Sequence, residues 1–342
     1  MASENNFEQQ AEQFREKYNK IRTEVGKVIV GHDEIVHGVL TCLVIGGHCL
    51  LEGAPGLGKT LLVRTLSQAL SLDFNRNQFT PDLMPADILG TNMVVETPDG
   101  KKSFEFQKGP IFTQICLADE INRATPKTQS AMLETMQEGT VTVGGTRYEL
   151  DKPFFVMATQ NPIEQEGTYP LPEAQLDRFL FKLNVGYSNR EQLATILDRT
   201  TKGTKIETNQ VMDGEEIIQW QGLIRKVILA DHLRDYIVRL TLATHPEGPL
   251  AVKATNNYLR WDSSPRGAQT MALASKVRAL LDGRFNVSFE DIRRVYLPTM
   301  RHRVIPNFEA MAEGISSDQI LQEILDAVGE KAEDGPFKAA TV

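Results

Sequence analysis

Apolar residues recur along the first half of the chain in two alternating patterns: short continuous runs, and longer stretches with helical spacing. The short runs are typical of strands buried on both faces of a sheet. Because strands that alternate with helices pair in parallel, the pattern predicts a three-layer α/β domain with a parallel sheet. The expected strands are His48–Glu52, Gln114–Ala118, Phe154–Ala158 and Phe179–Leu183, and the expected helices between them are Asp33–Ile45, Lys59–Leu70 and Thr125–Glu138.

Two pairs of strand-like segments interrupt this alternation. Turn residues between two such segments are typical of a β-hairpin. We therefore expect two β-hairpins inserted in the α/β core. The first pair, Thr91–Val95 and Ser103–Phe106, flanks Pro98-Asp99-Gly100, and the second pair, Thr140–Val143 and Thr146–Leu150, flanks Gly144-Gly145.

After about Gly186 the buried strands give way to helices. Ser264 and Pro265 are typical of an N-cap and a first helical residue, and Gly283 of a helix stop. A second helix is expected from Ser288, where Ser288-x-x-Asp291 resembles a capping box. These signals predict an all-α second domain.

Domain limits follow from these changes in pattern. Phe7–Val28 has thinly spaced apolar residues among charges and predicts an exposed amphipathic helix. We expect an N-terminal helix at 1–28, an α/β core at 29–186, a helical domain at 187–330 and a flexible tail at 331–342.

The composition mainly argues against certain classes of protein. The 342 residues suffice for two domains, at roughly 100–200 residues each. With 37 Lys and Arg against 45 Asp and Glu, the formal charge is −8, which argues against a protein that mainly holds nucleic acid. Cys42, Cys49 and Cys116 lie among apolar neighbours without a CxxC pair, so we expect reduced core residues.

The chain also lacks the pattern of a membrane or exported protein. The polar N-terminal segment has no apolar signal-peptide core. The longest apolar stretch, Val39–Leu51, is interrupted by Gly46, Gly47 and His48 and is too short to span a bilayer. We expect a cytoplasmic protein.

The most specific motif lies between the first expected strand and the helix after it. Its glycines let successive backbone N–H groups turn toward one point, which binds phosphate oxygens together with the positive end of the helix. Lys59 is expected to neutralise the β- and γ-phosphates of a nucleotide, and the Thr60 hydroxyl to bind Mg²⁺. The motif G-x-x-x-x-G-K-[ST] is matched by Gly53, Ala54, Pro55, Gly56, Leu57, Gly58, Lys59 and Thr60, with Leu61 next in the nucleotide-binding segment.

A second acidic motif follows the strand that ends near Ala118. Asp119 and Glu120 are expected at the carboxyl edge of the sheet, where ligands of open α/β sheets bind. Asp119 would hold the Mg²⁺ shell, so the expected metal residues are Thr60 and Asp119. Glu120 would orient the attacking water and accept its proton.

Two more polar residues are candidates for the nucleotide. Asn161 follows the third buried strand, where it either orients the water or the γ-phosphate, or caps the turn before Pro162. Arg266 is the second residue of its helix, where a cation near the positive helix end costs about 0.3–1 kcal/mol. A surface arginine tolerates that cost, but a bound phosphate would reverse it, which motivates a role in nucleotide sensing. The absence of an Asn-Lys-x-Asp motif favours ATP over GTP.

Together these residues resemble the MoxR group of AAA+ ATPases. The resemblance covers about residues 10–330, nearly the whole chain. The segments that carry it are Gly53–Thr60, Lys108–Phe112, Leu117–Ala124, Ala158–Pro162 and Glu166–Phe179. It implies a P-loop NTPase core of the AAA+ type, with two inserted hairpins and an all-α lid, that hydrolyses ATP with Mg²⁺.

The resemblance also implies roles for single residues. It makes Asn161 sensor 1, Arg178 an arginine finger that acts on a neighbouring subunit's nucleotide, and Arg266 sensor 2. With Lys59 and Glu120, the expected catalytic residues are thus Lys59, Glu120, Asn161 and Arg178. The resemblance places Val30 and Gly31 at the adenine pocket, although His32 stands where the family frequently has Gln.

An arginine finger in trans implies assembly, for which the family precedent is a hexameric ring. The residues near 87–110 and 139–152 would be the helix-2 insert and the pre-sensor-1 hairpin, facing the pore or a client. The leading hypothesis is an ATP-driven, chaperone-like remodeller of partner proteins, with a von Willebrand factor A domain partner implied by resemblance alone. The sequence identifies neither the client nor the cellular process.

Three alternatives remain open. One is a metal-chelatase motor subunit, which shares the clade and its hairpins. Another is a nucleic-acid motor, which the negative charge and the lack of an aromatic-basic stripe disfavour. The third is a scaffold that binds ATP without hydrolysis, against which the complete set Lys59, Asp119, Glu120, Asn161 and Arg178 argues.

Overall fold

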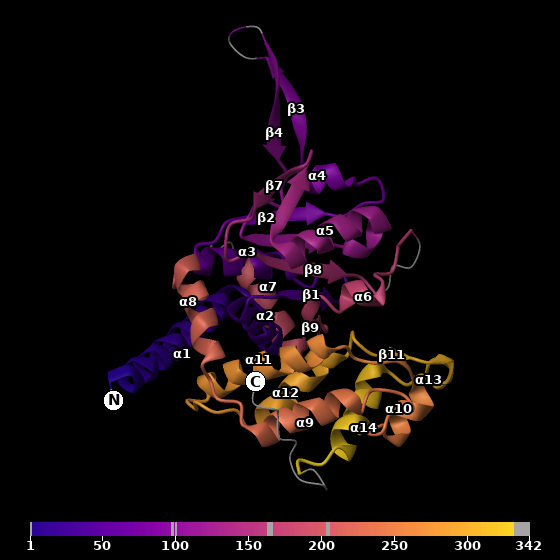
Figure 1. Ribbon diagram of the computed structural model, residues 1–342. Coiled ribbons are helices and arrows are strands. Elements are labelled where there is room, and N and C mark those ends of the chain that lie inside the picture. The colour runs from indigo at the N-terminus through magenta and orange to yellow at the C-terminus, as the bar shows by residue number, and fades with distance from the viewer. Residues whose placement is uncertain (1, 97–98, 100, 163–166, 203–205, 332–342) are drawn as a thin grey trace. The chain divides into compact units, whose positions relative to one another are not determined.

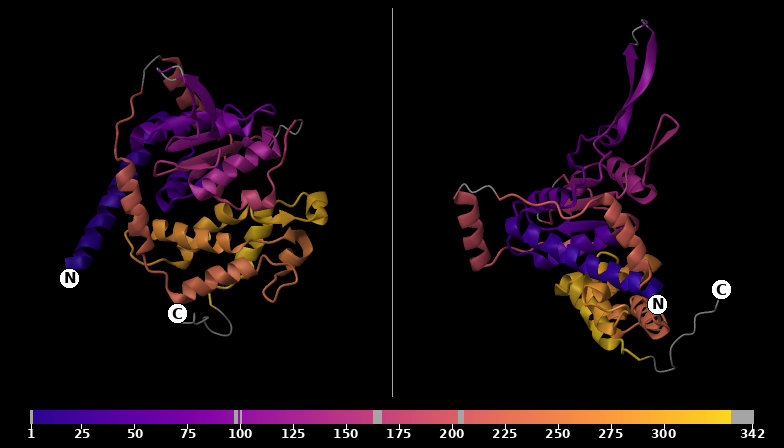
Figure 2. Two further views of the ribbon diagram at one scale, coloured as in Figure 1. Left: turned by 45° about the horizontal axis from the view of Figure 1, so that its top comes forward. Right: turned by 90° about the vertical axis from the view of Figure 1, so that its left-hand side faces the viewer.

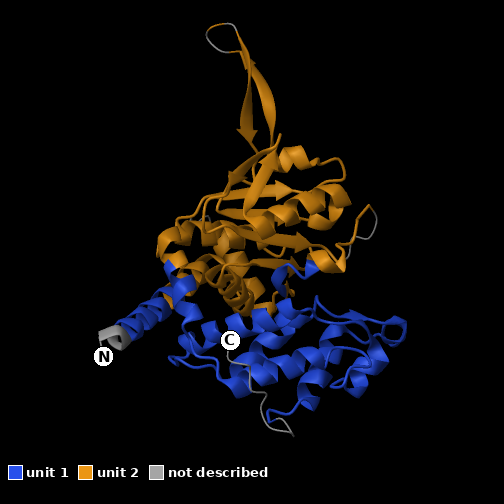
Figure 3. Ribbon diagram, in the orientation of Figure 1, with its two compact units in different colours: residues 1–18, 176–182, 219–342 blue, residues 19–175, 183–218 orange. Residues whose placement is uncertain are grey.

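The computed structural model describes residues 2–96, 99, 101–162, 167–202 and 206–331 (Figure 1). The chain divides into two compact units (Figure 3). The sheet unit comprises residues 19–175 and 183–218. The helical unit comprises residues 1–18, 176–182 and 219–342.

The central sheet has five strands in the order β2-β5-β8-β1-β9. Neighbours among the first four pair in parallel, so their carboxyl ends meet at one edge. Every residue of β5 is buried, and so are all but the last of β8, as expected of strands covered on both faces. The predicted α/β fold with a parallel sheet is therefore confirmed. The strands are β1 (His48–Glu52), β2 (Phe74–Gln78), β5 (Ile115–Asp119), β8 (Phe155–Gln160) and β9 (Phe179–Asn184).

The helices of the core agree closely with their expected limits. They are α2 (Asp33–Ile45), α3 (Lys59–Leu70) and α5 (Pro126–Glu138), with Thr125 as the N-cap and Gly139 as the C-cap of α5. The strand β2 was not predicted, because its sequence Phe-Asn-Arg-Asn-Gln is mostly polar and exposed at the sheet edge. The sheet unit also contains α4 (Pro85–Leu89), the 3₁₀ helix η1 (Ile121–Arg123) and α7 (Arg190–Thr201).

Both predicted hairpins are present. Strand β3 (Gly90–Glu96) pairs antiparallel with β4 (Lys102–Lys108), and β6 (Thr140–Val143) with β7 (Thr146–Glu149). The β3–β4 hairpin projects away from the rest of the sheet unit (Figure 2), and of its expected turn Pro98-Asp99-Gly100 only Asp99 lies within the described residues. Phe106 stacks on Tyr148 with ring centroids 4.1 Å apart, so the two hairpins contact each other.

The N-terminal helix differs from its prediction. Helix α1 (Ala2–Val28) ends where expected, but its apolar face is not exposed. Phe14, Tyr18, Ile21 and Val25 are all at most 1% exposed. Their three- and four-residue spacing is that of a helix face packed on a core, so the prediction of an exposed helix was wrong.

The second half of the chain is helical, as predicted, with one addition. The short strands β10 (Leu259–Trp261) and β11 (Ile305–Pro306) form an antiparallel pair that helical spacing does not predict. The remaining helices are α6 (Glu173–Leu176), α8 (Gly214–Arg225), α9 (Asp231–Leu242), α10 (Lys253–Tyr258), α11 (Pro265–Leu281), α12 (Phe289–Met300), α13 (Phe308–Glu313) and α14 (Ser317–Ala327).

The remaining expectations concern the cysteines, membrane helices, the domain limits and the tail. The three cysteines are unpaired and buried, as predicted. Among the described helices, none is long and apolar enough to cross a membrane. The sheet unit includes residues 187–218, while the domain limits 1–28, 29–186 and 187–330 stay a prediction. All of the expected tail 331–342 except Lys331 lies outside the described residues.

Candidate functional site

The glycine-rich loop joins β1 to α3 at the carboxyl edge of the sheet. Gly56 and Gly58 have φ values of +81° and +78°, a conformation that other residues rarely adopt. A Cβ at either position would meet no atom within 4 Å, so the backbone here borders open space. Lys59 and Thr60 are the first two residues of α3, whose N-cap Gly58 provides no side-chain cap. The backbone N–H groups of this helix end are thus suited to bind an anion.

The Lys59 ammonium donates a hydrogen bond to the Gly53 carbonyl at 2.7 Å. Burial lowers the pKa of Lys59, and the charges of Asp119 and Glu120 oppose that shift. Gly53 is itself confined, because a Cβ there would lie 2.7 Å from the Val185 carbonyl oxygen. The loop therefore holds its lysine close to the two acidic residues.

Asp119 is the last residue of β5, and its carboxylate is held on both oxygens. The Thr159 hydroxyl of β8 donates to Oδ1 at 2.6 Å. Arg76 of β2 donates to Oδ2 from Nε at 3.0 Å and from Nη2 at 2.7 Å. Both neighbouring strands thus fix this carboxylate at the sheet edge.

Glu120 lies directly beyond the strand in the left-handed region, with φ 57° and ψ 50°. Its N–H donates to the Thr159 hydroxyl at 2.8 Å. Its Oε2 accepts hydrogen bonds from Gln78 Nε2 at 2.8 Å and from Arg123 Nη1 at 3.1 Å. A non-glycine residue in this conformation is strained, and such strain is concentrated at functional sites.

Asn161 directly follows β8 and is 5% exposed. Strand β8 pairs with both β1 and β5, so Asn161 follows the strand that lies between the glycine-rich loop and Asp119. The Gly53 N–H donates to the carbonyl of the preceding Gln160 at 3.2 Å. This location fits the role implied by resemblance, which stays a prediction.

A cavity of about 410 Å³ lies beside the glycine-rich loop within the sheet unit. Its size suits a drug-sized or nucleotide-sized group, and apolar side chains dominate its lining. Its lining includes Val28 at the end of α1, Ile29 and Val30 after it, Gly56, Leu57 and Gly58 of the loop, Leu61 of α3, Tyr187, and Leu193, Ile196 and Arg199 of α7. Val30 therefore lines this cavity, while its place in an adenine pocket stays a prediction.

Gly31 does not line the cavity but contacts α7 closely. It has φ +71°, and a Cβ there would lie 2.5 Å from Gln192 Nε2. Gln192 closes the capping box at the start of α7 with Asn189. Gly31 thus sets how near α7 approaches the segment after α1.

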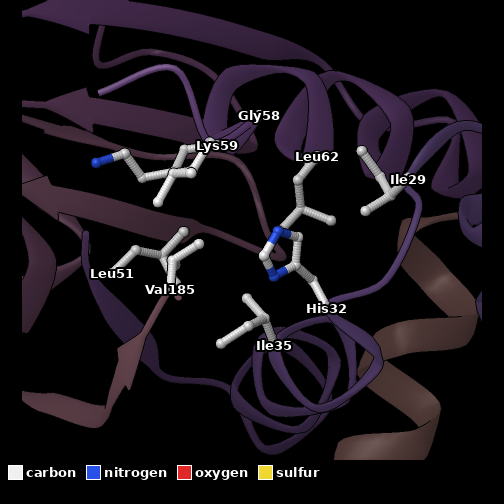
Figure 4. A pocket seen from close by; sticks show the side chains of 9 residues that line it. Ile29, His32, Ile35, Leu51, Gly58, Lys59, Leu62 and Val185 are labelled. Carbon is white, nitrogen blue, oxygen red and sulfur yellow. The ribbon is translucent and has the colours of Figure 1, made fainter. Parts of the chain in front are cut away.

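His32 adjoins both this cavity and a smaller apolar pocket next to it. Its ring lies between Ile35 and Leu62, while Lys59 points away (Figure 4). Burial lowers the pKa of His32, and Asp33 opposes the shift. A neutral imidazole at this position is suited to contact an uncharged base.

Arg178 and Arg266 belong to the helical unit. Arg178 immediately precedes β9 and is half-buried. Arg266 is the second residue of α11, 43% exposed at its side chain, with Nη1 3.6 Å from Asp177 Oδ2. The other expected site residues, Lys59, Thr60, Asp119, Glu120 and Asn161, all lie in the sheet unit.

Several residues of the site were not found from the sequence. Arg76 and Gln78 come from the unpredicted strand β2, and Thr159 from the middle of the apolar β8 run. Asn75 to Gln78 are consecutive polar residues without strand-like alternation, so no local signal points to β2. In the described part of the chain, no three His, Cys, Asp or Glu residues cluster in a way that could hold a metal ion alone.

Comparison with known proteins adds an independent observation. The pattern of the ATPase family associated with various cellular activities (AAA) matches residues 48–181, and that of the AAA lid domain matches residues 252–324. The chain is 40% identical over 305 residues to "Chaperone MoxR1" of Mycobacterium tuberculosis, covering 89% of this chain and 80% of the relative. It is 30% identical over 325 residues to "Protein MoxR" of Methylorubrum extorquens, covering 90% and 93%.

A solved structure is similar over nearly the whole chain. It is a candidate ATPase from Cytophaga hutchinsonii, with a TM-score of 0.89 and 41% sequence identity. The match covers 96% of this chain and 99% of that one. The similarity therefore includes both the sheet unit and the helical unit.

Proposed function

Because this chain belongs to the MoxR family of AAA+ ATPases, we propose that it hydrolyses ATP to remodel or mature partner proteins. The observation that carries the proposal is the arrangement around the glycine-rich loop. Lys59 and Thr60 are the first residues of α3, directly after the glycine-rich loop. Asp119 is the last residue of β5 and Glu120 follows it, at the same edge of the sheet. This is the set of groups that phosphoryl transfer to water requires.

The nucleotide's phosphates would lie against the loop from Gly53 to Gly58. The loop N–H groups and the N-terminal end of α3 would bind phosphate oxygens. The cavity lined by Val30, Leu61 and Ile196 is apolar and large enough for the adenine. Lys59 would exchange its bond to the Gly53 carbonyl for a phosphate oxygen.

The residues Thr60 and Asp119 fit a Mg²⁺ ion by their chemistry. Hydroxyl and carboxylate oxygens are the donors that Mg²⁺ prefers, and it completes its shell with waters and phosphate oxygens. The lack of a larger ligand cluster among the described residues agrees with such a shared shell. Bound there, the ion would neutralise charge that develops on the phosphates.

Glu120 is the residue we assign as general base. Gln78 and Arg123 both donate to Oε2 of its carboxylate, so Oε1 can accept a proton from the attacking water. Asn161, at the end of β8, would orient that water or the γ-phosphate. A positioned base contributes roughly 10²- to 10⁴-fold to rate.

Arg178 and Arg266 would complete the site in an assembly. We assign Arg178 to the nucleotide of a neighbouring subunit and Arg266 to the nucleotide of its own chain, in a homo-oligomeric, hexameric ring. The support is the family membership together with the placement of Arg266 at a helix N-terminus, where a phosphate offsets its unfavourable position. The cytoplasmic location and a von Willebrand factor A domain partner remain predictions.

Protein clients are favoured over the other motor classes. One relative carries the name chaperone, and the β3–β4 hairpin exposes Met93, Val94 and Phe104, the last to 79%. Apolar side chains on a projecting hairpin suit contacts with protein. A chelatase-type motor would instead respond to a metal-free porphyrin and a metal ion, and a nucleic-acid motor to DNA.

The test compares steady-state ATP turnover of the wild type with Glu120→Gln. We expect the variant to bind ATP and to lose at least about 10²-fold in turnover. Glu134→Gln, an exposed carboxylate on α5, is the matched control and should keep full turnover. Unchanged turnover in Glu120→Gln would reject Glu120 as the base, whereas a wild type that binds ATP without any turnover would favour the ATP-binding scaffold.

The proposed action of Arg178 on a neighbouring subunit's nucleotide has a separate test. Arg178→Ala subunits keep an intact site but lack the finger, and Glu120→Gln subunits lack the base but keep the finger. Mixed together, they should turn over ATP faster than the sum of the two variants alone. A mixture that only averages the two rates would place Arg178 outside the neighbouring site.

A further inference from the structure

Asp177, the residue before Arg178, joins three side chains that come from a distant part of the sequence. Its Oδ1 accepts a hydrogen bond from Arg303 Nε at 2.9 Å. Its Oδ2 accepts one from the Ser264 hydroxyl at 2.8 Å and lies 3.6 Å from Arg266 Nη1. All of these residues belong to the helical unit. One carboxylate therefore contacts both the residue before α11 and an arginine of its first turn.

Arg303 fixes the main chain on both sides of Arg178. Its side chain is 1% exposed. Besides the Asp177 carboxylate, its guanidinium donates to the carbonyls of Asp177 at 3.3 Å, Phe179 at 2.7 Å and Leu180 at 3.0 Å. Burying a guanidinium is costly unless its N–H groups are bonded. Here those bonds clamp the segment that carries Arg178.

Ser264 connects the same carboxylate to the start of α11. As N-cap, its hydroxyl oxygen accepts a hydrogen bond from the Arg266 N–H at 3.1 Å while donating its proton to Asp177. A carboxylate near a helix N-terminus is stabilised by the helix dipole. Asp177 thus holds both the main chain of Arg266, through Ser264, and its side-chain charge.

We propose that Asp177 is a positioning residue that couples Arg266 to Arg178. The proposal rests on the function above, in which Arg266 meets the chain's own nucleotide and Arg178 the neighbour's. A phosphate that attracts the Arg266 guanidinium removes a cation from Asp177 Oδ2, so that Arg303 and Ser264 are the remaining partners of that carboxylate. Because Arg303 also binds the main-chain carbonyls on both sides of Arg178, a shift of Asp177 moves the main chain at Arg178. Nucleotide in the chain's own site thereby sets the position of the arginine that acts on the neighbour's nucleotide.

The experiment is a double-mutant cycle of Asp177→Asn and Arg266→Ala on full-length protein. We expect each single variant to lower turnover at saturating ATP by about tenfold, since small displacements of catalytic groups cost up to 10²-fold. Because both act through one coupling, the double variant should turn over within about twofold of the slower single variant. Losses that multiply would overturn the proposal.

A second readout separates positioning from general damage. In the Glu120→Gln background, Asp177→Asn should strengthen ATP binding about threefold, because the Arg266 guanidinium no longer has to leave a carboxylate, and it should have no effect when Arg266→Ala is also present. An equal change in both backgrounds would show that Asp177 acts without Arg266, and so contradict the coupling.

Asp291 supplies a matched control in the same unit. Its side chain, 1% exposed, also binds an arginine and an N-cap serine, Arg284 and Ser288. Asp291→Asn should destabilise the unit without changing turnover per folded subunit or ATP affinity. If Asp177→Asn behaves like Asp291→Asn, the coupling fails while the ATPase proposal stands. If the wild type itself shows no turnover that depends on Glu120, the ATPase proposal fails instead.

Should Asp177→Asn not fold, Ser264→Ala tests the same link. It removes the hydroxyl bridge and leaves the Asp177–Arg303 pair in place. We expect turnover to decrease as in Asp177→Asn, but only by about threefold, since a single neutral hydrogen bond contributes roughly 0.5–1.5 kcal/mol. No change in turnover or in ATP affinity would overturn the coupling.

Discussion

Arg76 donates two hydrogen bonds to a single oxygen of Asp119, Oδ2, at 3.0 and 2.7 Å. That carboxylate is the one we assign to the Mg²⁺ shell, and its other oxygen is bound by Thr159. Both oxygens therefore have protein donors. Arg76 is 47% exposed at its side chain, so it can withdraw toward solvent when a metal requires the oxygen.

Arg76→Ala should lower the Mg²⁺ concentration needed for half-maximal ATP turnover. Exposed ion pairs contribute about 0.2–1 kcal/mol, so the decrease should be between roughly 1.4-fold and fivefold. Titration of Mg²⁺ at saturating ATP measures it. Arg76→Lys, which keeps the charge, should stay near the wild type. An increased Mg²⁺ requirement in Arg76→Ala would mean that the arginine orients Asp119 for the metal.

Glu120→Asn should be more stable than Glu120→Gln, although both remove the charge. Residue 120 has φ 57°, and asparagine tolerates the left-handed region better than glutamine does. We expect a difference of about 1 kcal/mol in the free energy of unfolding. Both variants should lose turnover. Denaturant unfolding measures the difference, and equal stability would mean that the conformation at residue 120 stores little strain.

Arg199→Ala should raise the KM for ATP about threefold and leave kcat near the wild-type value, because uniform binding is lost. Arg199 lines the 410 Å³ cavity and donates from Nη1 to the carbonyls of Gly26 and Lys27 at the end of α1. It thus holds α7 against one wall of the cavity. Lys202→Ala breaks only an exposed ion pair with Asp198 and is the control. A decrease in kcat alone would contradict this role.

His48 should make the protein less stable in mild acid. Its Nδ1 accepts from the Val156 N–H at 3.0 Å, and its Nε2 lies 2.9 Å from the Met136 carbonyl, so the ring is held neutral. Burial lowers the pKa of His48 to about 4, against 6.5 in the unfolded chain. The unfolded state therefore binds more protons between these values. The stabilisation is complete above pH 6.5 and is lost as pH falls toward 4, by roughly 3 kcal/mol in all.

The measurement is the free energy of unfolding at several pH values from 7.5 to about 4.5, for the wild type and His48→Gln. Buried His302 also has a pKa lowered well below 6.5. It is present in both proteins, so the difference between their slopes isolates residue 48. Parallel curves would show that His48 does not titrate on unfolding.

The sequence predicts most of the sheet because most of its strands are continuous runs of apolar residues. Strands such as β5 and β8 are buried throughout, so their apolar runs are unmistakable. Strand β2 is different: it lies at the edge, and four of its five residues are polar. Its assignment depends on pairing with β5, a long-range interaction that no local pattern contains.

The same limit explains which site residues were found. The residues from Gly53 to Thr60 form a contiguous motif, and Asp119 and Glu120 end a recognisable strand. Arg76 and Gln78 reach those acids only because β2 pairs beside β5. Arg303 is more remote still, since the segment it clamps lies 123 to 126 residues earlier in the chain. Local spacing identifies residues that act in a motif, but not the partners that fix them.

Lys59 holds the carbonyl of Gly53, the first residue of its own loop. The side chain that we assign to the phosphates therefore already ties the loop to itself. In the proposed function, a triphosphate would replace one acceptor of the Lys59 ammonium with another and would not have to order a flexible segment, so little chain entropy would be lost. On release of the phosphates, the carbonyl would accept the ammonium again. Such a loop suits an ATPase that binds and releases nucleotide in every turnover.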